Sequence, residues 1–231
     1  MPAILITGAN RGLGLEFARQ YSGEAWQVFA ACRNPSSANH LQELKKAPNR
    51  RLTILPIDVT DLASVVAAAK ELAGTAIDLL VNNAGIAGPS NQTTGRVDYR
   101  AWAHVLDVNT MGPLRLIESF ADQLARSDRR LVVTMTSGMG SLADNTSGGS
   151  IAYRTSKAAV NMVTRSAAID LASRRITCIV VNPGWVKTDM GGPGARLTPE
   201  ESVAALRRLI ANLTLEDSGK FFNWDGREYP W

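Results

Sequence analysis

The sequence contains few residues that could bind a metal ion or form a disulfide. Only two of its 231 residues are cysteine and two are histidine. Cys32 and Cys178 each lie within an apolar run, as reduced core cysteines do. His40 and His104 are far apart and have no companion residues in metal-ligand spacing. We therefore expect two free thiols and no metal site.

Long apolar segments and runs of one charge are also missing. No stretch approaches the length that crosses a membrane, and the first residues lack the basic and apolar regions of a signal peptide. The net charge of +4 is dispersed among 21 acidic residues and forms no basic stripe with interleaved aromatic residues. These features predict a soluble, cytoplasmic protein that binds neither membranes nor nucleic acid.

Short apolar, β-branched runs alternate with segments of helical periodicity. The expected strands are residues 3–7, 27–32, 51–56, 79–82, 131–136, 177–182 and 220–222, and the expected helices are 12–21, 36–46, 62–73, 99–126, 153–173 and 199–212. Strands that are apolar throughout indicate a parallel sheet covered on both faces. No linker or change of composition divides the chain. The pattern predicts an α/β doubly wound parallel sheet of about seven strands (a Rossmann fold), in a single domain over residues 1–231.

A glycine-rich turn directly follows the first expected strand and opens the first expected helix. Glycines allow a tight turn and a close approach of the backbone to a pyrophosphate, and the helix N-terminus offers free N–H groups and the positive end of a dipole. The spacing is Gly-x-x-x-Gly-x-Gly, not the commoner Gly-x-Gly-x-x-Gly. The alternative is a glycine-rich connection that binds no ligand. The expected cofactor contacts in this turn are Gly8, Asn10, Arg11, Gly12, Leu13 and Gly14.

The end of the second expected strand indicates which dinucleotide is bound. It lacks the acidic residue that holds the adenosine ribose hydroxyls in an NAD site and carries Arg33 instead. A guanidinium would pair with the 2′-phosphate of NADP(H) through two charge-assisted hydrogen bonds, and Arg11 could join it. Alternatively, one or both arginines are solvated surface residues. We expect NADP(H) to be preferred over NAD(H).

Tyr153 and Lys157 are one helical turn apart in the segment 153–173. A nearby ammonium favours the phenolate, so it lowers the pKa of a tyrosine toward the range in which a general acid or base works. The same spacing also fits an ordinary solvated contact on a helix surface. Only the remaining motifs of the chain favour the catalytic interpretation.

Taken together, the motifs resemble those of the short-chain dehydrogenase/reductase family, and the match covers nearly the whole chain. The resemblance is to the short, single-domain members. Residues 183–192 and 225–231 further resemble a carbonyl reductase branch that includes the sniffer-like enzymes and the bacterial C-factor proteins. The residues that carry the family pattern, in order, are the turn at 7–14, Asn82-Asn83-Ala84-Gly85, Asn109, Ser137, Tyr153, Lys157 and Pro183-Gly184.

The resemblance implies a role for four residues. Tyr153 would pass a proton to or from the carbonyl oxygen as a hydride moves between the substrate and the nicotinamide. Lys157 would lower the pKa of Tyr153 and hold the nicotinamide ribose. Ser137 would orient the carbonyl oxygen and stabilise its developing charge. Asn109, at a helix irregularity, would hold a water that connects Lys157 to solvent. Without the family pattern, Ser137 would be interpreted as an ordinary loop hydroxyl and Asn109 as a surface or helix-capping amide.

The resemblance also implies contacts along the rest of the cofactor. Asp58 and Val59 would face the adenine, although Asp58 could instead cap the next helix. The other implied contacts are Asn83, Ala84 and Gly85 along the adenosine ribose and Pro183, Gly184, Val186 and Thr188 around the nicotinamide.

The glycine-rich stretch 185–197 follows this site and would form a lid over a small, moderately apolar aldehyde, ketone or alcohol. The family also implies a homodimer or homotetramer. We expect an NADP(H)-dependent oxidoreductase that reduces an aldehyde or ketone, or catalyses the reverse reaction. The alternative is an NAD(P)-binding signalling or sensor protein of the C-factor type with incidental turnover.

Overall fold

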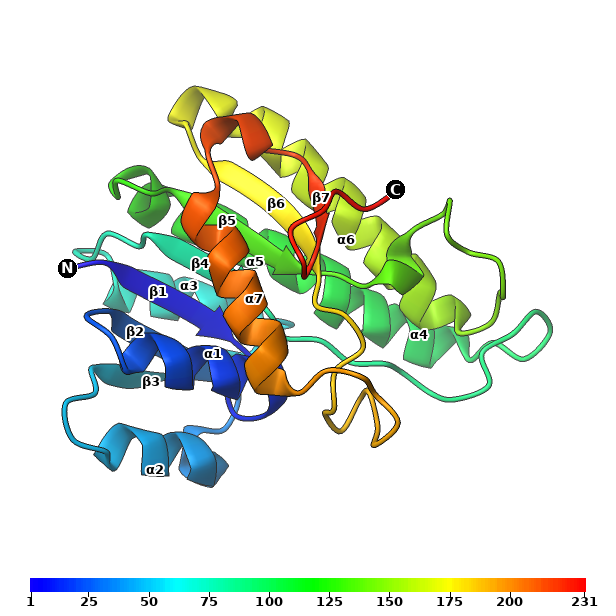
Figure 1. The fold of residues 1–231 in the computed structure, drawn as a ribbon, viewed down its shortest axis with the longest axis horizontal. Helices are drawn as coiled ribbons and strands as arrows, with labels where there is room; N and C mark the ends of the chain where they lie inside the picture. The colour runs from blue at the N-terminus through cyan, green and yellow to red at the C-terminus, as the bar shows by residue number, and fades with distance from the viewer.

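The structure, a computed structural model, describes residues 1–231 and is built on one sheet of seven parallel strands (Figure 1). The strand order is β3-β2-β1-β4-β5-β6-β7. Successive strands are therefore added toward one edge of the sheet from β1 to β3 and toward the other edge from β4 to β7, which makes the gap between β1 and β4 the kind of switch point at which doubly wound sheets bind ligands. This confirms the predicted fold class. The strands are Ala3–Thr7 (β1), Gln27–Cys32 (β2), Leu52–Pro56 (β3), Leu79–Asn82 (β4), Leu131–Met135 (β5), Thr177–Asn182 (β6) and Phe221–Asn223 (β7).

Helices cover both faces of the sheet (Figure 1). Two hydrophobic cores of 24 and 23 buried residues lie on the two faces, so neither face meets solvent. This explains why the strands are apolar throughout. One face is covered by α1 (Gly12–Ser22), α2 (Asn39–Lys46) and α7 (Pro199–Asn212), and the other by α3 (Leu62–Glu71), α4 (Tyr99–Leu106), α5 (Gly112–Ala125) and α6 (Ile151–Asp170).

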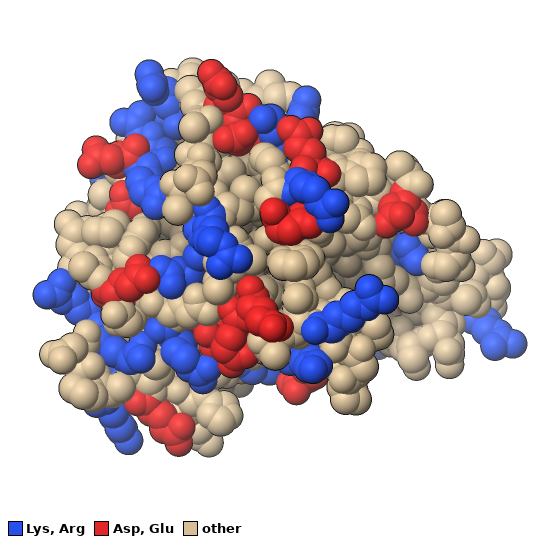
Figure 2. All heavy atoms as spheres, viewed as in Figure 1, with Lys and Arg blue, Asp and Glu red and all other residues tan.

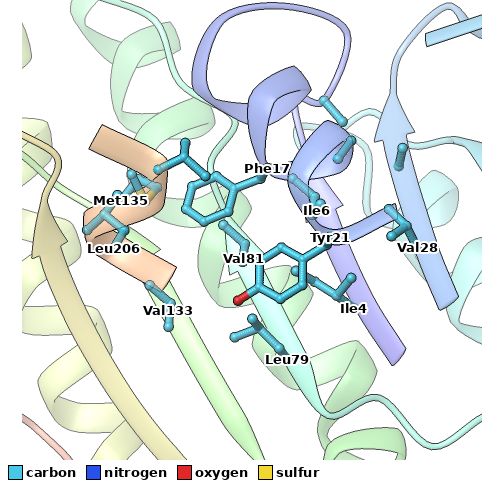
Figure 3. Close-up of a cluster of buried hydrophobic side chains, with 14 of the residues drawn as sticks. Ile4, Ile6, Phe17, Tyr21, Val28, Leu79, Val81, Val133, Met135 and Leu206 are labelled. Carbon is cyan, nitrogen blue, oxygen red and sulfur yellow. The ribbon is translucent and has the colours of Figure 1, made fainter. Parts of the chain in front are cut away.

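The position of the glycine turn is fixed by the packing of α1 on β1. Phe17 and Tyr21, four residues apart, share one face of α1 and lie against Ile4 and Ile6 of β1 (Figure 3). Leu5, between these two strand residues, points to the opposite core. Phe17 is fully buried, so its replacement by alanine would cost about 3–5 kcal/mol of stability. Because the turn joins β1 directly to α1, this packing holds it in place.

The predicted helix 99–126 is wrong as a continuous α-helix. A π-helical segment, Asp107–Met111, separates α4 from α5. Pro113 lies in the first turn of α5 and has no N–H to bond back to the preceding π-helical segment. Predicted helix 36–46 is likewise interrupted, because Pro35–Ser37 forms a separate 3₁₀ turn before α2. The predicted bounds of β1, β2, β4, β6 and α7 are confirmed, and the remaining bounds differ by one to three residues, at helix and strand ends where hydrogen bonding passes into turns.

None of the helices combines the length and apolar character needed to span a membrane. On the face shown in Figure 2, basic and acidic side chains are interspersed. No three histidine, cysteine or acidic side chains are grouped so that they could hold a metal ion. Cys32 and Cys178 are buried, free thiols.

Candidate cofactor and active site

A cleft of about 460 Å³ lies at the carboxyl ends of the strands. Its walls come from the glycine turn, from the ends of β2, β3 and β4, from α6 and from the predicted lid. Gly14, Gly184, Val186, Asn109 and Ser137 are not among its lining residues. The other predicted site residues all line it: Gly8, Asn10, Arg11, Gly12, Leu13, Arg33, Asp58, Val59, Asn83, Ala84, Gly85, Tyr153, Lys157, Pro183 and Thr188.

The glycine turn is packed tightly against the loop that follows β4. A Cβ atom on Gly14 would lie 2.5 Å from Asn83 Nδ2 and closer still to the Gly8 carbonyl oxygen. Asn83 Nδ2 donates to the Thr7 and Gly8 carbonyl oxygens at 2.9 and 3.2 Å. Thr7 Oγ1 accepts hydrogen bonds from the backbone N–H groups of Asn83 and Ala84 at 3.0 and 3.1 Å. Gly14 is therefore required by packing.

The N-terminus of α1 has no side-chain cap and no acidic residue in its first turn. The unpaired N–H groups of that turn and the helix dipole face the cleft, and this combination suits an anion. The turn thus fits the pyrophosphate of a dinucleotide.

Arg11 does not lie free beside Arg33, as the two-arginine interpretation required. Its Nη1 is 2.8 Å from Asp189 Oδ2 in the predicted lid, and the two side chains are 65% and 77% exposed. Arg33 lines the cleft together with Asn34 and Ser37, two polar residues that sequence reasoning did not assign. The group that fits a 2′-phosphate is therefore Arg33 with these neighbours.

Asp58 is not the N-cap of α3. Asp61 has that position and accepts from Ala63 N at 2.9 Å. Asp58 Oδ1 accepts from the Thr60 N–H and hydroxyl at 2.9 and 2.7 Å. Burial alone would raise the pKa of Asp58, but these hydrogen bonds and the nearby Arg33 lower it below its usual value. Asp58 therefore presents a carboxylate at the cleft wall.

Lys157 is buried in the floor of the cleft, with 5% of its surface exposed. Its Nζ donates to the Met135 carbonyl oxygen at 2.8 Å and lies 5.7 Å from the centre of the Tyr153 ring. Burial lowers the pKa of Lys157 to about 8, because an ammonium loses hydration in the interior. At pH 7 most of the molecules still carry the charge.

The Tyr153 phenol has a raised pKa, in contrast to the depression that the sequence argument predicted. Burial is the larger influence and raises the pKa, while the adjacent Ser137 side chain acts in the opposite direction. The sequence argument counted the charge of Lys157 but not the loss of water around the phenol. Within this chain, desolvation of the phenol outweighs the hydrogen bond with Ser137.

Asn109 lies inside the π-helical segment, where an irregularity was expected. Its Oδ1 accepts from Ile86 N at 2.9 Å, and its Nδ2 donates to Ile86 O at 2.8 Å and to Ser156 Oγ at 3.0 Å. Both amide hydrogens are thus bonded to protein groups. The side chain joins the loop after β4 to α6, so a water held by Asn109 would be bound by its backbone carbonyl oxygen or by the remaining lone pair of Oδ1.

Ser137 follows β5 and starts the loop that leads to α6. Its Oγ accepts from Met139 N at 3.1 Å, which caps the 3₁₀ turn Gly138–Gly140. Gly140 lies so close to Lys157 that a Cβ there would be 2.8 Å from the lysine's backbone. This packing and the short turn bring Ser137 beside Tyr153.

Several cleft residues carried no recognisable motif. Most of them follow directly after predicted strands, so their position at a strand end was the signal that could have identified them. Ser37, His104 and Val108 come from helical segments and had no such signal. Met190, named for the lid, also lines the cleft. The unassigned lining residues are Cys32, Asn34, Ser37, Ile57, Thr60, Ile86, His104, Val108, Met135, Thr136 and Asp189.

Comparison with known proteins gives a consistent result. The chain matches the short chain dehydrogenase family model over residues 2–196. C-signal from Myxococcus xanthus is 44% identical over 155 residues, which cover 67% of this chain and 93% of that protein. The 1-hydroxy-2-glutathionyl-2-methyl-3-butene dehydrogenase of Rhodococcus sp. (strain AD45) is 35% identical over 238 residues and covers 100% of both chains.

Solved structures show the same likeness over the full length. Carbonyl reductase Sniffer of D. melanogaster superposes with a TM-score of 0.93 at 35% identity and covers 100% of both chains. The NADPH-bound carbonyl reductase from chicken fatty liver superposes with a TM-score of 0.93 at 37% identity and covers 100% of this chain and 99% of that one. Motifs, fold and relatives agree: the chain belongs to the short-chain dehydrogenase family, in the neighbourhood of the Sniffer carbonyl reductases and C-signal.

Proposed function

We propose that this protein is an NADP(H)-dependent oxidoreductase that reduces an aldehyde or ketone to an alcohol, or catalyses the reverse reaction. The observation that carries the proposal is one cleft whose walls include both the uncapped glycine turn and the Tyr153–Lys157 pair. A hydride carrier and a proton donor can then meet at one carbonyl group. The NADPH-bound carbonyl reductase that superposes over the full chain supports the same reaction class.

The residues of the cleft fit the cofactor from end to end. The turn at 8–14 would hold the pyrophosphate, and Arg33 with Asn34 and Ser37 would hold the 2′-phosphate. Asp58 and Val59 would face the adenine, and Asn83, Ala84 and Gly85 would line the adenosine ribose. Pro183 and Thr188, which line the cleft, would surround the nicotinamide together with Gly184 and Val186, which lie close to them in the chain. When bound, NADPH supplies the hydride.

The chain's own groups supply the proton. The Tyr153 hydroxyl donates to the carbonyl oxygen as negative charge develops there, and the Ser137 hydroxyl stabilises that charge. A raised pKa keeps Tyr153 protonated at neutral pH, which is the form that a reductase requires. Lys157, charged below about pH 8, stabilises the phenolate that remains and holds the nicotinamide ribose. Asn109 holds the loop after β4 against α6, next to Lys157.

Exposed apolar side chains on the lid and on the loop after β5 favour a moderately apolar substrate. Trp185 and Met190 of the lid are 56% and 52% exposed, and Leu142 on the loop after β5 is 77% exposed. We assign residues 185–197 as the substrate lid of a single domain. Met162 and Ile169, both 67% exposed on α6, favour a homodimer or homotetramer, and the protein would work in the cytoplasm.

The second candidate function is a nucleotide-binding signalling protein, favoured by the 44% identity with C-signal. NADPH oxidation with a panel of aldehydes and ketones separates the two functions. We expect turnover that Tyr153→Phe reduces by about 100-fold or more, while Tyr99→Phe, a change at an exposed tyrosine on α4, has no effect. Turnover unchanged in Tyr153→Phe contradicts the assigned proton donor. Tight NADPH binding without turnover on any carbonyl supports the signalling function.

A further inference from the structure

The last eight residues, 224–231, here called the C-terminal segment, fold back over β7. Asn223 N donates to Arg227 O at 2.8 Å, and Tyr229 N donates to Phe221 O at 2.7 Å. The rings of Tyr229 and Trp231 lie 5.0 and 5.4 Å from the Phe221 ring. The segment is therefore anchored on a buried residue of the sheet.

From this anchor the C-terminal segment reaches the loop 137–149, here called the serine loop because it begins with Ser137. The Trp231 carbonyl oxygen accepts from Ser141 Oγ at 2.9 Å, from Ala143 N at 3.2 Å and from Leu142 N. Residues 142–148 of this loop are all exposed. Hydrogen bonds, and not packing, therefore hold the middle of the serine loop.

Tyr229 makes the contact nearest to the active site. Its hydroxyl donates to Asp144 Oδ2 at 2.7 Å, and a Cβ atom built on Gly138 would lie 2.7 Å from the hydroxyl oxygen. The hydroxyl thus touches the residue next to Ser137 and bonds to the middle of the same loop. Asp144 also binds within the loop, through its N–H to Ser141 Oγ at 3.1 Å.

We propose that Tyr229 is a positioning residue for Ser137 and acts by bonding Asp144 and closing the serine loop against Gly138. The C-terminal segment then forms the part of the active site that keeps the serine hydroxyl aimed at the carbonyl oxygen. This inference rests on the proposed function, in which Ser137 binds that oxygen.

The hydroxyl of Tyr229 does not take part as an acid. Its hydrogen bond to the Asp144 carboxylate raises the pKa of Tyr229 to about 12, so it stays protonated wherever the enzyme would work. Its contribution is geometric. A donor displaced by even a fraction of an ångström from the developing oxyanion stabilises it less.

A double-mutant cycle tests the proposal. Tyr229→Phe and Asp144→Ala each remove the bond, Asp144→Asn keeps a carbonyl acceptor, and Tyr229→Phe/Asp144→Ala removes both partners. Tyr99→Phe is the control. For each protein the measurements are kcat and KM with one carbonyl substrate, the Kd for NADPH, the melting temperature, and amide hydrogen exchange over residues 138–149.

We expect Tyr229→Phe and Asp144→Ala to lower kcat by about 5-fold each. The double variant should be no worse than either single variant. Asp144→Asn should retain most of the activity, and the Kd for NADPH should stay within 2-fold in all variants. Exchange over 138–149 should be faster in every variant except Asp144→Asn and Tyr99→Phe.

The inference would be overturned by unchanged kcat in Tyr229→Phe with unchanged exchange, or by additive losses in the double variant. A lower melting temperature with normal kcat would reduce Tyr229 to a structural residue and would also overturn it. If the wild-type protein turns over no carbonyl, the proposed function fails. The exchange pattern still decides whether Tyr229 and Asp144 hold the serine loop.

Discussion

Arg11 in the glycine turn and Asp189 in the lid are joined by a 2.8 Å ion pair on the wall of the cofactor cleft. The two residues are 178 positions apart in the chain. The pair links the segment proposed to hold the pyrophosphate to the proposed lid over the nicotinamide. It also places a carboxylate where the proposed anionic cofactor would bind.

We expect Asp189→Ala to tighten NADPH binding, because it removes a negative charge and releases Arg11 for the cofactor phosphates. Both side chains are more than half exposed, so solvent screening keeps the effect to about 2- to 3-fold at low salt. The Kd for NADPH measured by fluorescence titration at low and high salt checks this. Weaker binding in Asp189→Ala would show that the ion pair organises the site.

The second prediction concerns the choice of cofactor. Arg33→Asp should shift the ratio of kcat/KM for NADPH over NADH by about tenfold or more toward NADH. The change removes the partner of the 2′-phosphate and supplies a carboxylate for ribose hydroxyls. Arg100→Asp, at an exposed position of α4, is a charge-matched control. If the ratio of kcat/KM for NADPH over NADH is the same in wild type and in Arg33→Asp, Arg33 does not bind the 2′-phosphate.

The third prediction concerns stability and pH. The pKa of Lys157 is lowered from 10.5 to about 8, so between these values the unfolded chain binds a proton that the folded protein has released. This group therefore makes the free energy of unfolding rise with pH across that window, by up to about 3 kcal/mol. Below pH 8 the full cost of burying the ammonium is present. Lys157→Met should lack this rise.

Urea unfolding at pH 7, 8, 9 and 10 measures this rise in stability. The quantity to compare is the free energy of unfolding of wild type minus that of Lys157→Met at each pH. In this difference the contributions of the other titrating groups cancel. The lost hydrogen bond to Met135 adds only a constant amount that does not vary with pH. Lys70→Met, at an exposed lysine, should follow the wild-type curve. A difference that does not change between pH 8 and 10 would mean that Lys157 titrates normally.

A fourth prediction concerns the pH dependence of alcohol oxidation. Burial raises the pKa of Tyr153, and oxidation needs the phenolate as the base. The rate should therefore rise with pH up to an alkaline midpoint. Lys157 has itself lost its proton above about pH 8, so it carries no charge at that midpoint. Lys157→Met should therefore leave the alkaline midpoint in place and lower the rate below pH 8, where a positive charge 5.7 Å from the ring centre is lost. Profiles of kcat/KM for an alcohol and NADP+ check this. A midpoint that moves upward in Lys157→Met would show that Lys157 keeps its charge at alkaline pH.

Much of the fold could be predicted because apolar strands and periodic helices are local patterns. The glycine turn and the Tyr153–Lys157 spacing are local as well, and they were placed in one cleft as expected. Features that depend on distant partners could not be predicted. Asn109 bonds Ile86 across 23 positions and Tyr229 bonds Asp144 across 85. The raised pKa of Tyr153 depends on burial, which the sequence around a residue does not show.

The π-helical segment Asp107–Met111 has one further consequence. It accommodates one residue more than an α-helix would, and an α-helix turns through about 100° per residue. Because the π turn absorbs the extra residue, deleting a single residue there would restore regular α-helix and leave α5 in nearly the same rotation relative to α4. Phe120 of α5, which is fully buried, would keep its core position, but Asn109 would lose the backbone geometry that sets its side chain against Ile86. Such a deletion should therefore damage the site more than the packing of α5.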